Sequence, residues 1–252
     1  MPTPIDLLMD PVTQVMLAMI AGLALWERIA PGRVLPRVRG WHARALAAFV
    51  VYFLLSSYLP LLWGETLAPL QWFDLSAWPT WAAVALGLLA YEFGAYFWHR
   101  SMHRFTPLWR TLHQMHHSSE RLDVASAFWF SPLDMVTWTL LPSVVLAILG
   151  LPAQAATTTI LLITFLSMFQ HANVCTPHWL GVLVQRPEMH TVHHARGIHH
   201  FNYADLPFID LLFGTFRNPR TFEHATGFWH GASRRVLDML LLRDVSRQPG
   251  AR

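Results

Sequence analysis

The chain has 252 residues, of which 54% are hydrophobic and only 13% are charged, and its formal net charge is +3 at pH 7. Soluble domains have roughly 45–50% apolar and about 25% charged residues, so this composition excludes an ordinary soluble domain and is typical of a membrane protein. The basic residues are all arginines, scattered or flanking apolar runs, which argues against nucleic acid as a partner. The single cysteine, Cys175, excludes an internal disulfide and an all-thiolate metal site, and we expect it to be a small core residue.

Five apolar stretches predict membrane-spanning helices, because crossing a hydrocarbon core roughly 30 Å thick requires about 20 mostly apolar residues. In chain order they cover residues 12–26, 43–63, 81–98, 133–149 and 153–169. Only Gly150-Leu151-Pro152 separates the last two, which predicts a tight turn between antiparallel neighbours. A pair this short has an alternative arrangement, in which it dips into the bilayer without fully crossing it.

The distribution of the arginines predicts the topology. Three segments are rich in them: the connection between the first two stretches, the connection after the third, and the region after the fifth. These arginines are Arg28, Arg33, Arg37, Arg39 and Arg44; Arg100, Arg104, Arg110 and Arg121; and Arg186, Arg196, Arg217, Arg220, Arg234 and Arg235. Residues 64–80, which connect the second and third stretches, contain no basic residue. Because basic residues favour the cytoplasmic side, five crossings with the N-terminus outside would place all three segments in the cytoplasm.

The more polar segments predict a cap on one end of the bundle. Residues 99–130 and 170–244 are mixed in character, and prolines interrupt the second segment too often for another crossing. We expect both segments to form a cytosolic cap of short helices, and residues 245–252 to form a disordered tail. The predicted fold is therefore all-α: a polytopic transmembrane helical bundle with a helical cap that carries the metal site, in a single domain over residues 1–252.

Eight histidines form three arrays in the predicted cap. The arrays are His99-x-x-x-His103, His113-x-x-His116-His117 and His190-x-x-His193-His194. Residues three and four apart share a face of a helix, so each array can direct two or three imidazoles at one point. Histidine is the commonest metal ligand, and eight of them can hold more than one transition-metal ion. The arrays therefore predict a metal centre on the cytoplasmic face.

The type of ligand narrows the choice of metal. Imidazoles suit zinc, copper, iron and nickel, whereas calcium and magnesium prefer oxygen ligands. One zinc ion uses at most four ligands, so eight histidines are better matched to two ions. Iron fits because two neighbouring iron ions can reduce and activate O₂. The Glu-x-x-His motif of soluble di-iron bundles does not occur in the sequence, which excludes that class.

The order of the arrays and their surroundings resemble the integral-membrane fatty acid hydroxylase and sterol desaturase superfamily. The similarity runs from about Tyr91 to Phe216. Besides the arrays, the matching segments are Trp98-His99-Arg100, Leu108-Trp109, His117-Ser118, Gln170-His171-Ala172-Asn173, Pro187, Asn202-Tyr203 and Asp210-Leu211-Leu212-Phe213-Gly214-Thr215-Phe216. Two positions depart from the family pattern: Trp129-Phe130-Ser131-Pro132 stands where many members have Arg-x-His-Pro, and Ala204 stands where Gly is usual.

This resemblance implies a non-haem centre of two iron ions held by the array histidines, with O₂ as co-substrate. It implies hydroxylation or desaturation of a C–H bond in a fatty acyl chain or a sterol-like lipid that enters from the bilayer. The sequence has no haem-binding extension, no Gly-x-Gly-x-x-Gly motif and no set of iron–sulfur cysteines. The expected electron donor is therefore a separate electron-transfer protein.

Four residues near the arrays are candidates for further roles at the metal centre. The resemblance makes His171, at the end of the fifth stretch, a candidate ninth ligand. His199 and His200 follow the third array, and they are candidates either for hydrogen bonds to the ligands or for simple surface residues. Asn202 is a candidate supporting residue of the same segment.

Three acids are candidates for supporting roles. Asp205 and Asp210 could orient ligand histidines through the second ring nitrogen, as the outer partners of metal ligands usually do. Asp210 could equally cap a helix. Glu92 precedes His99 by two helical turns on roughly the same face, so it could bond a ligand histidine or line a substrate tunnel.

Three other functions stay open at the level of the sequence. A desaturase could use the same scaffold and the same metal centre. A zinc-dependent membrane hydrolase would contain about one zinc ion per chain and act without O₂. A membrane transporter would place ionisable groups near the bilayer midplane, whereas these histidines cluster outside the apolar stretches, which argues against transport.

Overall fold

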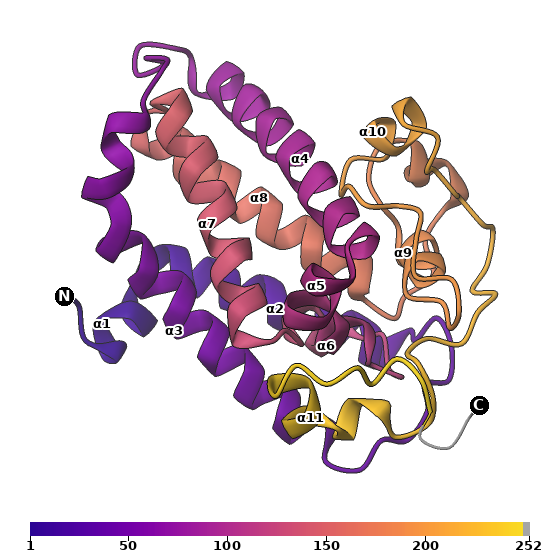
Figure 1. Cartoon of the computed structure of the whole chain (residues 1–252). Helices are drawn as coiled ribbons and strands as arrows, with labels where there is room; N and C mark the ends of the chain where they lie inside the picture. The colour runs from indigo at the N-terminus through magenta and orange to yellow at the C-terminus, as the bar shows by residue number, and fades with distance from the viewer. Residues whose placement is uncertain (249–252) are drawn as a thin grey trace.

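The structure is a computed structural model that describes residues 1–248, and all regular secondary structure in this range is helical (Figure 1). Five helices are long and apolar enough to cross a membrane. They are α2 (Pro11–Ile29), α3 (Trp41–Leu67), α4 (Thr80–Arg104), α7 (Pro132–Leu149) and α8 (Ala153–His171). The predicted all-α class and the five predicted stretches are therefore confirmed.

Shorter helices connect the long ones and follow them. The α-helices are α1 (Pro4–Met9), α5 (Thr106–Leu108), α6 (Gln114–His117), α9 (Pro187–His193), α10 (Pro207–Leu212) and α11 (Val236–Leu240). A π-helical turn covers Trp109–His113, and 3₁₀ turns cover Ala68–Leu70, Val124–Phe128, His178–Val182 and Ala232–Arg234. Most of these elements lie beside the ends of the long helices that carry the histidines (Figure 1).

The limits of α7 follow from its local sequence. The Ser131 hydroxyl accepts a hydrogen bond from the backbone N–H of Asp134 at 3.2 Å, and Pro132 occupies the first helical position, where its missing N–H costs nothing. The helix ends at Gly150, which adopts the left-handed conformation with φ +59°. A Cβ atom there would lie 2.6 Å from the carbonyl oxygen of Phe73, so the turn into α8 requires glycine.

Helix α4 is central to the bundle, because it packs against both α7 and α8, while α3 packs against α7 and α2 packs against α8. Gly150-Leu151-Pro152 joins α7 to α8 as predicted, but the two helices diverge from this turn (Figure 1). The predicted turn is therefore present, but the two helices are not the closely packed neighbours that the prediction implied, and each packs on α4 instead. Their divergence leaves room for a cavity that both helices line.

The histidine arrays lie at one end of the bundle, where α2, α4 and α8 end and α3 and α7 begin. The segment between α6 and α7 ties two of these ends together. Its Asp123 accepts from the indole N–H of Trp41 at the start of α3, and the N–H of its Val124 donates to the carboxylate of Glu27 near the end of α2 at 2.8 Å. Every arginine in residues 1–248 lies at these helix ends, in the segments that join them, or in the region that follows α8. That this end faces the cytoplasm stays a prediction.

Three sequence-based expectations are corrected. Helix α4 continues to Arg104, so His99 belongs to a spanning helix and not to a cap that begins at residue 99. Cys175 is exposed and not part of the core, because it lies in the loop after α8. Val245 is buried, and its N–H donates to the Gln114 side chain at 3.2 Å, so the predicted disordered tail does not begin there. Residues 249–252 of that predicted tail lie outside the described residues.

Candidate metal centre

Nine histidines converge from four segments of the chain and form two groups. The first cluster consists of His99, His103, His113, His117 and His193, and the second cluster consists of His116, His171, His190 and His194. Within each cluster, one ligand atom from each residue lies within 4.8 Å of the others. The eight array histidines and His171 are thus brought together as predicted, and each array directs two of its imidazoles at one cluster.

The division between the clusters follows helical geometry. His113 and His117 are four residues apart and share the first cluster, whereas His116 turns to the second. In the third array, His190 and His194 are four apart and share the second cluster, whereas His193 turns to the first. Residues four apart differ by only about 40° around a helix, while adjacent residues differ by about 100°. Each His-x-x-His-His array therefore supplies both clusters.

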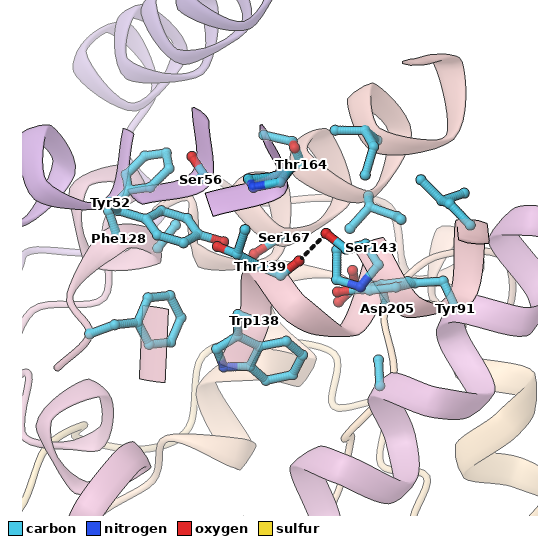
Figure 2. Close-up of a pocket in the computed structure, with 18 of the residues that line it drawn as sticks. Tyr52, Ser56, Tyr91, Phe128, Trp138, Thr139, Ser143, Thr164, Ser167 and Asp205 are labelled. Carbon is cyan, nitrogen blue, oxygen red and sulfur yellow. Dashed lines mark hydrogen bonds between the residues drawn. The ribbon is translucent and has the colours of Figure 1, made fainter. Parts of the chain in front are cut away.

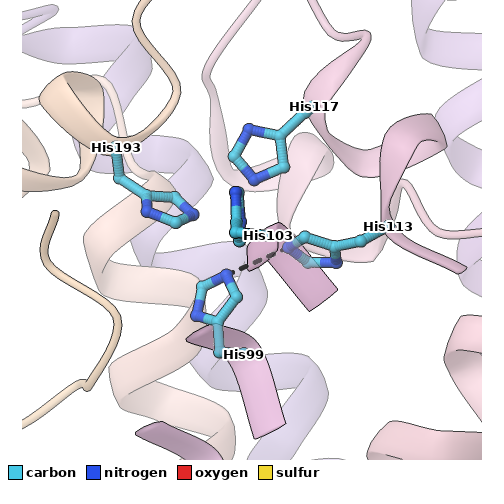
Figure 3. Close-up of side chains that lie close together, drawn as sticks. All are labelled: His99, His103, His113, His117 and His193. Carbon is cyan, nitrogen blue, oxygen red and sulfur yellow. Dashed lines mark hydrogen bonds between the residues drawn. The ribbon is translucent and has the colours of Figure 1, made fainter. Parts of the chain in front are cut away.

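The first cluster points its imidazole rings at a common centre (Figure 3). The Nε2 atoms of His99 and His113 lie 3.0 Å apart. The other three rings, those of His103, His117 and His193, each have a buried Nε2 atom without a hydrogen-bond partner among the described residues. A buried unpaired polar atom costs about 1–3 kcal/mol, and a metal ion at this centre would satisfy all of these nitrogens.

The second cluster is also built from Nε2 atoms. The Nε2 atom of His171 lies 3.2 Å from that of His116 and 3.1 Å from that of His190. The Nε2 atom of His194 lies 3.1 Å from that of His190. Two nitrogens that each bind one ion at about 2.1 Å are separated by about 3.0–3.4 Å for octahedral or tetrahedral angles. The observed spacings fit that range in both clusters.

Hydrogen bonds to the second ring nitrogen hold the first cluster in orientation. The Nδ1 atom of His99 lies 2.8 Å from the carbonyl oxygen of Tyr203, and that of His193 lies 2.7 Å from the carbonyl oxygen of Phe201. The Nδ1 atom of His113 lies 2.9 Å from the buried carboxylate of Asp134. A backbone carbonyl or carboxylate at Nδ1 fixes the tautomer that leaves Nε2 free for a metal, as in known metal sites.

The two clusters are adjacent. The rings of His117 and His194 stack with centroids 4.1 Å apart and an interplanar angle of 12°, although they belong to different clusters. The rings of His113 and His116 lie 5.0 Å apart. Phe130 stacks on His116 at 4.3 Å and closes one side of the second cluster. Two ions in these clusters would therefore be close neighbours.

Burial favours the neutral form of the six clustered imidazoles that lie outside the spanning helices. In the second and third arrays, burial lowers the pKa of each histidine well below its usual value. Neighbouring histidines lower the pKa further. These residues are His113, His116, His117, His190, His193 and His194. Only the neutral imidazole offers a lone pair to a metal, so the site favours the binding form at neutral pH.

A cavity of about 640 Å³ extends from the histidines into the bundle between α3, α4, α7 and α8. Histidines of both clusters line its inner end: His99, His113, His116, His171 and His190. Most of its wall is apolar, and Figure 2 shows a belt of polar side chains within it, which includes Tyr52, Ser56, Thr139, Ser143 and Thr164. The Ser143 hydroxyl donates to the carbonyl oxygen of Thr139 at 2.9 Å. A long apolar molecule with few polar groups fits this cavity.

The two histidines that follow the third array, His199 and His200, have different environments. His199 is partly buried, and its Nδ1 atom lies 3.1 Å from that of His117, so it supports a residue of the first cluster. Burial lowers the pKa of His199 to about 4. His200 is exposed and lies 2.7 Å from the carbonyl oxygen of Ile198, so it is a surface residue.

Asn202 and Asp210 shape the loop that supplies the carbonyl groups of Phe201 and Tyr203. The buried Asn202 amide donates to the carbonyl oxygens of Met189 and Arg217, at 2.9 Å each. The Asp210 carboxylate accepts from the N–H of Tyr203 at 2.9 Å and from Ala204 at 2.9 Å. Asp210 therefore supports His99 only through the loop, and the prediction that it bonds a ligand histidine is wrong.

The side chain of Glu92 bonds the backbone of Asp205, a contact that the sequence did not indicate. The Glu92 carboxylate is fully buried and accepts from the N–H groups of Asp205 and Leu206 at 2.9 and 3.2 Å, so it ties α4 to the loop after the third array. The side chain of Asp205 accepts from Gln170 at 2.8 Å, and it lines the cavity. Neither carboxylate bonds a histidine in residues 1–248, and Glu92 is not among the residues that line the cavity. Both predicted roles of Glu92 are therefore wrong.

Sequence reasoning missed Asp134 and Tyr203 as partners of the clustered histidines. Asp134 lies in the first turn of α7, and it touches His113 only because α7 begins beside the second array. Tyr203 contacts three rings, those of His99, His103 and His193, with centroids 5.4–5.5 Å away. An acid at the start of an apolar stretch was the one signal for Asp134, whereas no signal identified the carbonyl group of Tyr203.

Comparison with known proteins places these residues in a family. A fatty acid hydroxylase family model matches residues 84–215. An ornithine lipid hydroxylase from Rhizobium tropici is 34% identical over 146 residues, 56% of this chain and 44% of the relative. A Delta(7)-sterol-C5(6)-desaturase from Nicotiana tabacum is 33% identical over 54% of this chain and 49% of the relative. A human alkylglycerol monooxygenase is 33% identical over 64% of this chain and 35% of the relative.

These relatives are matched over less than half of their own length. The matched part of this chain contains all nine clustered histidines and the loop up to Thr215. No solved structure matches the chain significantly.

Proposed function

The chain belongs to the fatty acid hydroxylase family, and on this premise we propose that it is a membrane oxygenase that hydroxylates a C–H bond of a lipid. The relatives named above are a hydroxylase, a desaturase and a monooxygenase, which are all oxidoreductases. The five spanning helices and the family make the chain an integral, multi-pass membrane protein. The lipid class, O₂ and an external electron donor belong to the proposal.

The single observation that carries the proposal is the position of two adjacent histidine clusters at the inner end of an apolar cavity. Five and four imidazoles would each hold one ion, and we propose that both ions are iron. When bound, the iron ions would supply the activation of O₂. A single zinc ion would leave at least five of the nine histidines without a role. The donor set therefore favours two ions over the hydrolase alternative.

The chain's own residues would position the lipid and protect the reaction. The walls of the cavity, from α3, α4, α7 and α8, hold an acyl chain or sterol-like body and exclude water. His99, His113 and His116 line the cavity as well as the clusters, so a carbon at its inner end lies beside the metal centre. Rate depends steeply on such positioning. The carbonyl groups of Tyr203 and Phe201 and the carboxylate of Asp134 hold the rings that would bind the metal.

A desaturase is the second candidate, because the tobacco relative carries that activity. Removal of a second hydrogen would give an alkene where oxygen transfer gives an alcohol. The position of the lipid decides between these outcomes, and both use the same histidines.

Metal analysis and product analysis test the proposal together. Protein purified without O₂ should contain about two iron ions per chain, and lipid extracts of expressing cells should contain a species heavier by one oxygen atom. His116→Ala should abolish that species while the protein still inserts into the membrane. His178→Ala, outside both clusters, is the matched control and should retain activity. One zinc ion with no iron, or full activity of His116→Ala, would contradict the proposal.

A further inference from the structure

A second cavity, of about 770 Å³, lies between α2, α3 and the 3₁₀ turn Val124–Phe128. Its apolar part is lined by residues that include Leu17, Ile20, Ala24 and Leu46. Leu46 of α3, which is 61% exposed, and Ala24 of α2, which is also exposed, line it, so the cavity opens sideways between these helices on the outer surface of the bundle. In a membrane that surface faces the bilayer.

One end of this second cavity is basic. Arg28, Arg33 and Arg121 line it together with His42, at the end of the bundle where the arginines gather. From Leu17 to Arg28, helix α2 rises about 16 Å, so the cavity runs from the arginine-rich end into the apolar zone. An acyl lipid has the same division into a polar head and an apolar chain.

The two acidic side chains that line this cavity already accept hydrogen bonds from the protein, whereas one of its arginines forms no ion pair among residues 1–248. The Glu27 carboxylate accepts from the N–H of Val124, and the Asp123 carboxylate accepts from the side chains of Trp41 and Arg121. Arg28 is exposed and takes part in none of the ion pairs of residues 1–248. The charge left for a ligand is therefore positive, which favours an anionic headgroup.

Two phenylalanines separate the second cavity from the cavity that contains the histidines. Phe49 and Phe128 line both cavities, and their rings meet edge to face with centroids 4.9 Å apart. Phe49 is only partly buried, and Tyr52 of the same helix also packs on Phe128, with ring centroids 6.2 Å apart (Figure 2). From His42 to Phe49, helix α3 rises about 10 Å, so the partition lies within reach of a chain whose head is at the arginines.

We propose that the second cavity is the lipid entrance of the enzyme. An acyl lipid with an anionic headgroup binds there, with its head at Arg28 and its chain along α2, and the chain reaches the histidines by displacing the Phe49–Phe128 pair. This proposal rests on the proposed function for the passage of substrate, but the binding step does not depend on it. Phe49 is the more exposed member of the pair, so the proposed opening begins with a change of its rotamer.

Binding is tested on the purified protein by native mass spectrometry with dioleoyl phosphatidylglycerol and dioleoyl phosphatidylcholine. The anionic lipid should bind more tightly. Arg28→Gln should weaken its binding about fivefold, the effect of one basic residue near a headgroup, and should leave phosphatidylcholine unchanged. Arg220→Gln removes an exposed arginine that lines neither cavity, and it should have no effect. Equal binding of both lipids, unchanged by Arg28→Gln, would overturn the site.

Passage is tested by filling the cavity. Ala24→Trp places a large side chain in it, whereas Ala21→Trp makes the same change on α2 at an exposed position outside the lining. Ala24→Trp should abolish the tight phosphatidylglycerol adduct and lower product formation at least tenfold at unchanged metal content, and Ala21→Trp should do neither. Loss of the adduct with full product formation would overturn the entrance. Because lipid binding is measured without turnover, failure of the oxygenase function would leave the binding result interpretable.

Discussion

The most direct test of the metal centre is the substitution Asp134→Asn. Among residues 1–248, His113 is the only clustered histidine that bonds a carboxylate, at 2.9 Å, and both side chains are at most 1% exposed. Loss of such an outer carboxylate typically weakens metal binding 10–100-fold, which corresponds to about 1.4–2.7 kcal/mol. Asn keeps the size of the side chain but removes its charge. Because His113 belongs to the first cluster only, one of two iron sites should weaken by this factor and the other should not.

Equilibrium dialysis with ferrous iron under anaerobic conditions measures the two affinities. Asp123→Asn is the matched control, since Asp123 is also a buried acid but accepts from Trp41 and Ser126 and touches no histidine. It should lower thermal stability and leave both iron affinities unchanged. Iron binding of Asp134→Asn that equals wild type, or an equal loss at both sites, would refute the reasoning that Asp134 acts through His113.

Three further predictions concern the clusters and their supporting loop. His103→Ala and His194→Ala should each lower the iron content by about one ion, because they belong to different clusters; loss of both ions from either variant, by elemental analysis, would mean a single shared site. Asn202→Ala removes three hydrogen bonds of a buried side chain, so it should cost about 3 kcal/mol and lower Tm by about 6–12 °C in detergent; a shift below about 2 °C would contradict this. Glu92→Gln keeps an acceptor for two N–H groups, whereas Glu92→Ala leaves these buried groups unpaired, so Glu92→Ala should have the lower Tm. Equal Tm values for the two variants would contradict the bridging role of Glu92.

The nine histidines show how far reasoning from the sequence reaches. Arrays with spacings of three and four predicted a metal centre, and the order of the arrays with their neighbours predicted the family, which the family match confirms. Those predictions succeed because spacing along a helix fixes which side chains share a face. The sorting into five and four also follows from helical angles, since His116 and His117 point in directions about 100° apart.

The supporting contacts were less predictable. Asp205, Asp210 and Glu92 were candidates for orienting histidines directly, but they hold the loop of residues 202–206 in place. That loop contains Asn202 with φ +48°, and the carbonyl group of its Tyr203 faces the ring of His99. Backbone carbonyl groups carry no sequence signal, because every residue has one. The same limit applies to Cys175, whose exposure depends on what packs over the loop after α8.

The sequence by itself determined the helical class, the five spanning helices, the arginine-rich end and the histidines that meet there. These features depend on composition and on periodicity along one helix, which are local properties. Only the tertiary structure decided that α7 and α8 diverge around a cavity, that Asp134 meets His113, and that Phe49 and Phe128 separate two cavities. Such contacts join residues from 21 to 79 positions apart, and the packing of whole helices, which no local pattern encodes, fixes them.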